Sequence, residues 1–132
     1  MKVLVDSTSW LLVLRRSWPD PGVAPELDSL IRDGRVVIIG PIRQEILSGI
    51  KERAHFERLR DRLRGFPDAE ITAADYEEAA SFYNECRRNG IQGSHIDFLI
   101  CAVAVRNGFS IFTRDGDFAQ YAKYLPITLY DS

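Results

Sequence analysis

Five acidic residues stand where short apolar runs begin or end: Asp6, Glu45, Asp97, Asp115 and Asp117. Carboxylate oxygens are hard ligands that suit Mg²⁺ or Mn²⁺. One or two such ions can activate water and stabilise the leaving oxygen when a phosphodiester bond is cleaved. These residues are therefore candidate metal ligands and catalytic groups.

Each acid also has an ordinary interpretation, because Asp and Glu favour the first turns of helices and the solvated surface. Asp97 fits that interpretation least well. It opens a run, Phe98 to Val105, that is apolar almost throughout, and an unpaired charge against such a helix is costly. A shared position for several acids would argue further against separate surface roles.

Hydrophobic patterning predicts strands that alternate with helices. The expected strands are 2–6, 36–39, 69–71, 110–113 and 127–130. Strands that alternate with helices are typical of a parallel α/β sheet. The predicted fold class is therefore α/β, a parallel-sheet α/β/α sandwich of about five strands with helices on both faces.

The expected helices lie between these strands. They are a helix from Ser7 or Thr8 to about Arg16, a short one through Leu27 that stops at Gly34, a helix or helix pair from Pro41 to Leu63, one from Thr72 to about Asn89, a central one over 96–105 that stops at Gly108, and a short one over 118–124. Pro19, Pro21, Gly22 and Pro25 indicate a loop after the first helix. Thr72 and Asp75 form a variant of the capping box.

Ligands of parallel α/β sheets bind beyond the carboxyl ends of the strands. Asp6 ends the first strand, Glu45 follows the second, Asp115 follows the fourth, and Asp97 opens the helix that leads into the fourth. We expect these four segments to bring their carboxylates to one edge. Crowded carboxylates repel one another in the absence of metal, so some of their pKa values should be raised.

Length and composition place the chain among ordinary folded domains. The 132 residues are 45% hydrophobic and 27% charged, which predicts a single domain, 1–132, ordered throughout. No apolar stretch approaches the ~20 residues that cross a membrane, and no export signal precedes Val3. Two cysteines without metal-site spacing fit a cytoplasmic protein.

Net charge gives no direct argument for a nucleic-acid partner, because the formal value is −2. The segment Lys51 to Arg64 is locally basic. Contact with RNA phosphates is one interpretation of it, and a solvated helix face is the usual one. His55 and His95 lack metal-ligand spacing and are assigned structural or surface roles.

Four pieces of sequence resemble the PIN-domain nucleases, and especially the VapC-like toxins of toxin–antitoxin pairs. They are Val3-Leu-Val-Asp-Ser-Thr8, Glu45 after the Val36–Ile39 run, Asp97 before Phe98 to Ala104, and Thr113-Arg-Asp-Gly-Asp-Phe118. The last matches the family's T-x-D-x-D-F pattern and is the most specific. The resemblance covers essentially the whole chain as one PIN-like domain.

The resemblance implies a metal-dependent endoribonuclease, the toxin of a type II toxin–antitoxin pair. Asp6, Glu45, Asp97 and Asp115 would be the catalytic, metal-binding acids, with Asp117 as an accessory ligand. Thr8 and Thr113 would orient carboxylates or water. The implied cofactor is Mg²⁺ or Mn²⁺, and the implied partners are an RNA substrate, a cognate antitoxin and a second copy in a homodimer.

Other functions stay open at this point. A housekeeping RNA-processing nuclease with the same domain is the nearest, and a noncatalytic RNA-binding or protein-interaction module is the main one outside enzymes. A phosphohydrolase that uses Asp6 as nucleophile is weaker, because Thr8 stands where a second Asp is expected and no partnering lysine motif is evident.

Overall fold

A computed structural model describes residues 1–14 and 24–130. The predicted loop residues Pro19, Pro21 and Gly22, and the expected end of the first helix at Arg16, lie outside these residues. The elements in chain order are β1 (Val3–Val5), α1 (Ser7–Leu14), α2 (Ala24–Arg32), β2 (Val36–Val37), α3 (Gly40–Leu47), α4 (Arg53–Leu63), α5 (Ala73–Arg88), α6 (His95–Asn107), β3 (Ser110–Phe112) and α7 (Asp117–Tyr121). Pro25, expected in the loop, lies in the first turn of α2, where its missing N–H needs no partner.

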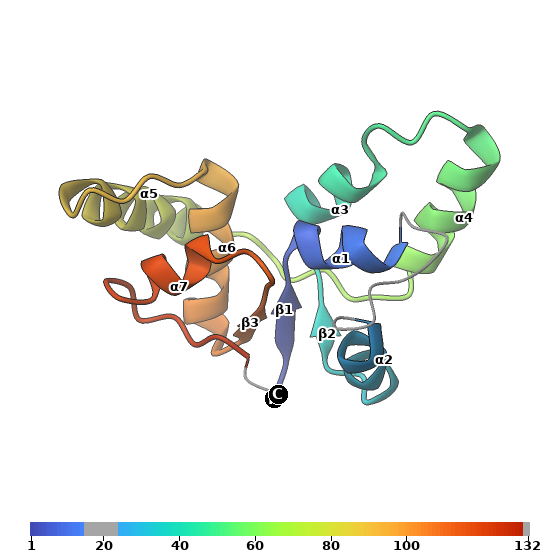
Figure 1. The fold of residues 1–132 in the computed structure, drawn as a ribbon, viewed down its shortest axis with the longest axis horizontal. Coiled ribbons are helices and arrows are strands. Elements are labelled where there is room, and N and C mark those ends of the chain that lie inside the picture. The colour runs from blue at the N-terminus through green and yellow to red at the C-terminus, as the bar shows by residue number, and fades with distance from the viewer. Residues whose placement is uncertain (15–23, 131–132) are drawn as a thin grey trace.

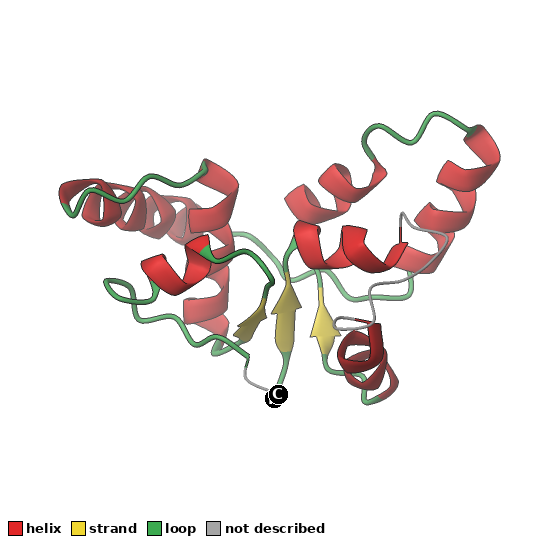
Figure 2. Ribbon diagram, in the orientation of Figure 1, coloured by secondary structure: helices red, strands yellow, loops and turns green. Residues whose placement is uncertain are grey.

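The sheet is parallel, with strand order β2-β1-β3. Val3 pairs with Val36 on one side and with Ser110 on the other. In Figure 1 the three arrows point towards the same edge, with α5, α6 and α7 on one side of the strands and α1 to α4 on the other. Figure 2 shows the same layout by element type. The predicted α/β class with a parallel sheet is confirmed.

The strand count is lower than predicted, because three strands form within the described residues. Two isolated bridges form at or beside the other predicted strands. Leu129, within 127–130, bridges to Ile111, and Asp68, just before 69–71, bridges to Ile38. A proline, Pro67 or Pro126, closely precedes each segment, and proline has no N–H to extend a ladder. Each segment therefore lies beside the sheet without joining it as a strand.

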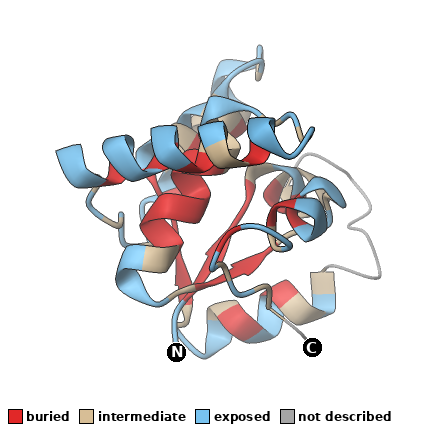
Figure 3. Ribbon diagram, turned by 90° about the vertical axis from the view of Figure 1, so that its left-hand side faces the viewer, coloured by how far each residue is buried: buried red, intermediate tan, exposed pale blue. Residues whose placement is uncertain are grey.

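The core is centred on the sheet and on α6. All three strands are buried, and so are the seven consecutive residues of α6 from Phe98 to Ala104. Figure 3 shows this burial along the strands and the central helix. Gly108 ends α6 in the left-handed conformation, at φ 70°, as its position in the sequence predicts. No helix in the described parts of the chain is long and apolar enough to cross a membrane.

Candidate functional site

Asp6 follows β1 directly and is the buried acid of the sheet edge, with 3% of its surface exposed. The backbone N–H of Ser9 donates to Oδ1 at 2.9 Å, and the Thr113 hydroxyl donates to Oδ2 at 2.6 Å. Burial raises the pKa of Asp6, these hydrogen bonds oppose the rise, and the charge of Asp115 adds to it. The Asp6 carboxylate is thus a confined charge at the end of the central strand.

The loop after β3 continues from Asp6 through a series of hydrogen bonds. The Thr113 hydroxyl accepts the backbone N–H of Asp115 at 2.9 Å while it donates to Asp6. Asp115 Oδ1 in turn accepts the backbone N–H of Asp117 at 2.9 Å. Asp115 is half-buried and Asp117, the first residue of α7, is exposed. Thr113 therefore links an acid from each end of the chain.

Asp97 lies in the first turn of α6, where its backbone N–H donates to the hydroxyl of the N-cap residue Ser94. Its carboxylate accepts a hydrogen bond at Oδ2 from the Tyr121 hydroxyl, at 2.6 Å. Burial raises the pKa of Asp97, the bonds from Tyr121 and Ser94 lower it, and the charge of Asp115 raises it. Burial and the Asp97 charge raise the pKa of Tyr121, so its phenol remains a donor.

Asp97 differs from Asp75, an acid at the same position in the first turn of α5. Thr72 and Asp75 have the same spacing as Ser94 and Asp97, and they form the predicted capping box at the start of α5. The Asp75 carboxylate accepts a hydrogen bond from the Thr72 N–H and pairs with Arg106 at 2.6 Å. The Arg106 hydrogen bond lowers the pKa of Asp75, although burial opposes it. Asp75 thus pairs with a cation, whereas Asp97 forms no salt bridge among the described residues.

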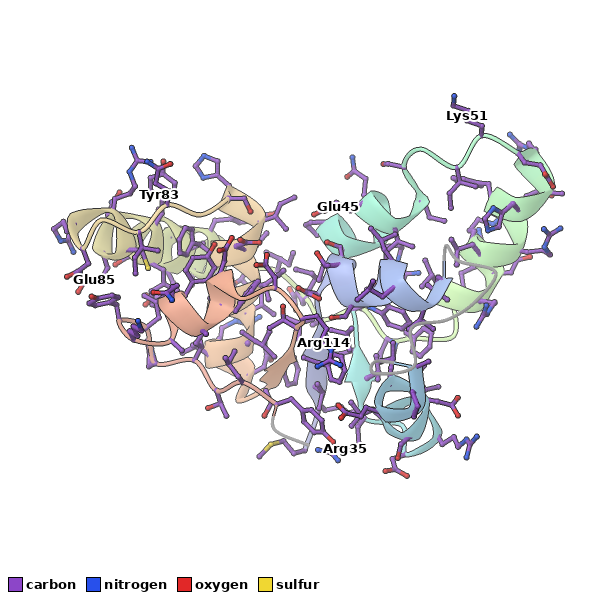
Figure 4. All side chains as sticks on the ribbon, viewed as in Figure 1. Arg35, Glu45, Lys51, Tyr83, Glu85 and Arg114 are labelled. Atoms are coloured by element: carbon purple, nitrogen blue, oxygen red, sulfur yellow. The ribbon has the colours of Figure 1, made fainter. Side chains whose placement is uncertain are left out.

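Glu45 reaches the edge from α3 and is held by α1. The Ser7 hydroxyl donates to Glu45 Oε2 at 3.1 Å. Figure 4 labels Glu45 on α3, beyond the carboxyl end of the strands. Thr8, expected to orient a carboxylate, is exposed, and the hydroxyl that reaches an acid in this turn belongs to Ser7. The phase of α1 decides this, because Ser7 and not Thr8 faces α3.

The structure brings the predicted acids together unevenly. The charge of Asp115 raises the pKa of Asp6 and of Asp97, and the charge of Asp117 raises the pKa of Tyr121. Within residues 1–14 and 24–130, however, no three His, Cys, Asp or Glu side chains converge closely enough to hold a metal ion by themselves. Sequence reasoning missed Ser7 and Tyr121, since nothing in their spacing showed that they face Glu45 and Asp97.

The basic segment Lys51 to Arg64 lies apart from this edge. Its cations partly pair with acids of the same helix, Arg53 with Glu57 and Arg60 with Asp61. Figure 4 shows Lys51 far from the sheet, beside α4. These internal pairs favour the solvated-face interpretation of the segment. His95 is exposed and stacks on Tyr83, with ring centroids 5.0 Å apart.

The chain matches a known protein family over most of its length. The family model described as PIN domain matches residues 3–124, which includes all five acids. The chain belongs to the PIN-domain family. This confirms the family that the sequence motifs resemble, and it places the acidic edge within the matched region.

Relatives of this PIN domain carry more specific names. The chain is 32% identical over 125 residues to the protein named VapC ribonuclease Mb1587 of Mycobacterium bovis, with 92% of each chain covered. It is equally similar to the protein named Ribonuclease VapC11 of Mycobacterium tuberculosis. The likeness therefore extends over nearly the full length of both relatives.

Solved structures share the fold of this PIN domain. FitAcB from Neisseria gonorrhoeae matches with a TM-score of 0.74 at 18% identity, covering 98% of this chain and 96% of that one. VapBC2 from Rickettsia felis, solved with a DNA fragment from the promoter, matches with a TM-score of 0.75 at 14% identity, covering 100% and 99%. At these identities the likeness shows the fold alone.

Proposed function

We propose that this PIN domain is a ribonuclease of the VapC type, the toxin of a type II toxin–antitoxin pair, which hydrolyses RNA phosphodiester bonds. Its catalytic acids are Asp6, Glu45, Asp97 and Asp115. The observation that carries the proposal is the Asp6 carboxylate, which is buried at the sheet edge without a salt bridge among the described residues, in a chain 32% identical to named ribonucleases.

The contrast between two buried acids supports this function over a purely structural one. Asp75 and Asp6 are both at most 3% exposed. Asp75 pairs with Arg106, whereas Asp6 has no salt bridge within the part of the chain that the structure describes. A buried charge is costly unless it is paired or binds a metal. Asp6 therefore has the properties of a cation ligand, and Asp75 has those of a structural acid.

The donor set fits a divalent, partly hydrated ion. Mg²⁺ commonly takes one or two protein carboxylates and completes its shell with water and substrate oxygens, so convergence of three side chains is not required. Asp6, Asp97, Asp115 and Glu45 would hold Mg²⁺ or Mn²⁺, with Asp117 as an accessory group. When bound, the ion supplies water activation and stabilisation of the leaving oxygen.

The residues around the acids have positioning roles in this proposal. Thr113 fixes the Asp6 carboxylate through its hydroxyl and fixes the backbone of Asp115 at the same time. Ser7 holds Glu45 from the first turn of α1. The negative charge of these acids attracts cations and repels phosphates. The RNA backbone would therefore approach the acids only when a bound cation offsets their charge.

An antitoxin partner and a homodimer belong to the same proposal. The matched structures include a toxin–antitoxin complex from Klebsiella pneumoniae, with a TM-score of 0.72. An apolar hollow between α1, α2 and α4 is lined by the half-buried side chains of Val13, Leu14 and Ile31, among others. Surfaces of this kind bind amphipathic segments of partner proteins, which agrees with inhibition by a small antitoxin.

RNA cleavage by the purified protein tests the proposal. A mixed RNA pool is incubated with Mg²⁺, with Mn²⁺ or with EDTA, and the wild type is compared with Asp97→Asn. Asp61→Asn removes an acid that is 60% exposed and lies on α4, away from the edge, and serves as the matched control. All three proteins are first shown to be folded by circular dichroism.

We expect metal-dependent cutting by the wild type and by Asp61→Asn, and loss of cutting in Asp97→Asn. Cutting that persists in EDTA would contradict the role of the metal. If the folded wild type cuts nothing with either ion, the proposal gives way to a noncatalytic binding module.

A further inference from the structure

The Tyr121 hydroxyl is a buried polar group directed at one of the proposed acids. Tyr121 is fully buried, and its hydroxyl donates to Asp97 Oδ2 at 2.6 Å across 24 residues of sequence. Its ring lies between Phe98, at 4.8 Å between centroids, and Phe118, at 5.1 Å. These contacts leave the phenol little freedom, so the direction of its hydroxyl is fixed by the core.

Gly93 provides the space that this hydroxyl occupies. A Cβ atom at position 93 would lie 2.4 Å from the Tyr121 oxygen, 2.8 Å from Tyr121 Cζ and 2.8 Å from Phe98 Cζ. Side chains in a packed core do not move aside without cost. A glycine immediately before the α6 cap therefore lets Tyr121 approach Asp97.

We propose that Tyr121 is a positioning residue for Asp97, and that Gly93 is the residue that makes room for it. This inference rests on the proposed function. A carboxylate has two oxygens and about four lone-pair sites, so a donor on Oδ2 fixes the rotation of the group and leaves room for a cation. Without the hydroxyl, the Asp97 carboxylate can rotate and binds a cation less well.

The strength of such support is known for other sites. Groups that hold metal ligands in place typically change metal affinity or activity by about 10–100-fold when they are removed. Tyr121→Phe keeps the ring and its packing and removes only the oxygen. We therefore expect Tyr121→Phe to require about tenfold more Mn²⁺ for half-maximal binding.

The first test measures Mn²⁺ binding to the full-length protein by calorimetry, beside RNA cleavage at a series of Mn²⁺ concentrations. Wild type and Tyr121→Phe are compared with Tyr124→Phe, which removes a phenol from a side chain that is 43% exposed nearby. We expect weaker Mn²⁺ binding in Tyr121→Phe, with cleavage that recovers at high Mn²⁺, and wild-type values in Tyr124→Phe.

A second pair of variants separates positioning from folding. Gly93→Ala pushes the Tyr121 hydroxyl away, so it should lower both stability and Mn²⁺ affinity. Adding Tyr121→Phe to Gly93→Ala removes the closest clash. The double variant should therefore recover part of the melting temperature while its Mn²⁺ affinity stays low, which a purely structural role would not produce.

Wild-type Mn²⁺ affinity in folded Tyr121→Phe would overturn the inference and leave the ribonuclease proposal intact. Recovery of Mn²⁺ affinity together with stability in the double variant would also overturn it, because the hydroxyl is absent there. A wild-type protein that neither binds Mn²⁺ nor cuts RNA would instead refute the proposed function.

Discussion

Phe118 closes the Thr113–Phe118 motif, and the structure assigns it to packing. It is 1% exposed and contacts the Tyr121 ring edge-on. A buried Phe covers about 150–250 Å², which corresponds to roughly 4–6 kcal/mol at about 25 cal/mol per Å², and the Cβ that remains in Ala keeps part of that burial. Core Phe→Ala changes cost about 3–5 kcal/mol. We therefore expect Phe118→Ala to lower the free energy of unfolding by about 4 kcal/mol.

That loss corresponds to a large shift in melting temperature. With an unfolding entropy of about 2.1 cal/mol/K per residue over 132 residues, 4 kcal/mol lowers the Tm by about 14 °C. Urea denaturation and thermal scans measure both quantities. Tyr124→Ala, at a side chain that is 43% exposed, should cost less than about 1 kcal/mol. A loss below about 1 kcal/mol in Phe118→Ala, with cleavage abolished, would refute the packing role and indicate a contact with substrate.

Three further outcomes follow from the charges. Folding raises the pKa of Asp6 and Asp97. The protonated form of each acid is therefore favoured by folding, and this stability is lost as the pH rises through the folded pKa. The Tm of the metal-free protein should accordingly rise as the pH falls from neutral towards the ordinary Asp pKa of about 4. Asp75, whose pKa is lowered, acts in the opposite sense, so the trend should reverse below about 4; a Tm that falls steadily from neutral pH would contradict this. Mn²⁺ should raise the Tm of the wild type more than that of Asp6→Asn, and equal shifts would argue against Asp6 as a ligand. Arg106→Gln should lower the Tm more than Arg32→Gln, because Arg106 pairs with buried Asp75 and Arg32 pairs with an exposed acid; thermal scans that show equal losses would count against the pair.

The element pattern was predictable where local chemistry is decisive. Thr72 and Asp75 form reciprocal hydrogen bonds at the start of α5, and Gly108 ends α6 because it adopts a positive φ. Segments 69–71 and 127–130 are predicted as strands from their place next to expected helices. Both segments pack beside the sheet, and a single bridge forms at or next to each of them, so neither becomes a strand.

The candidate site was predictable to the extent that strand ends determine it. Asp6 and Asp115 follow β1 and β3, so the parallel sheet alone places them at one edge. The partners of the acids depend on helix phase and on packing between distant segments. Ser7 could not be distinguished from Thr8, and Tyr121 could not be connected with Asp97, because both contacts form only in the folded chain.

The central position of β1 determines when the sheet edge can assemble during synthesis. β1 precedes both of its neighbours, β2 and β3, in the sequence, and the bond from Thr113 to Asp6 spans 107 residues. Contacts between residues so far apart in sequence form late and slowly. The acidic edge therefore cannot assemble until the segment that carries Thr113 and Asp115 has been translated, and a nascent chain that stops before this segment carries Asp6 without these two neighbours.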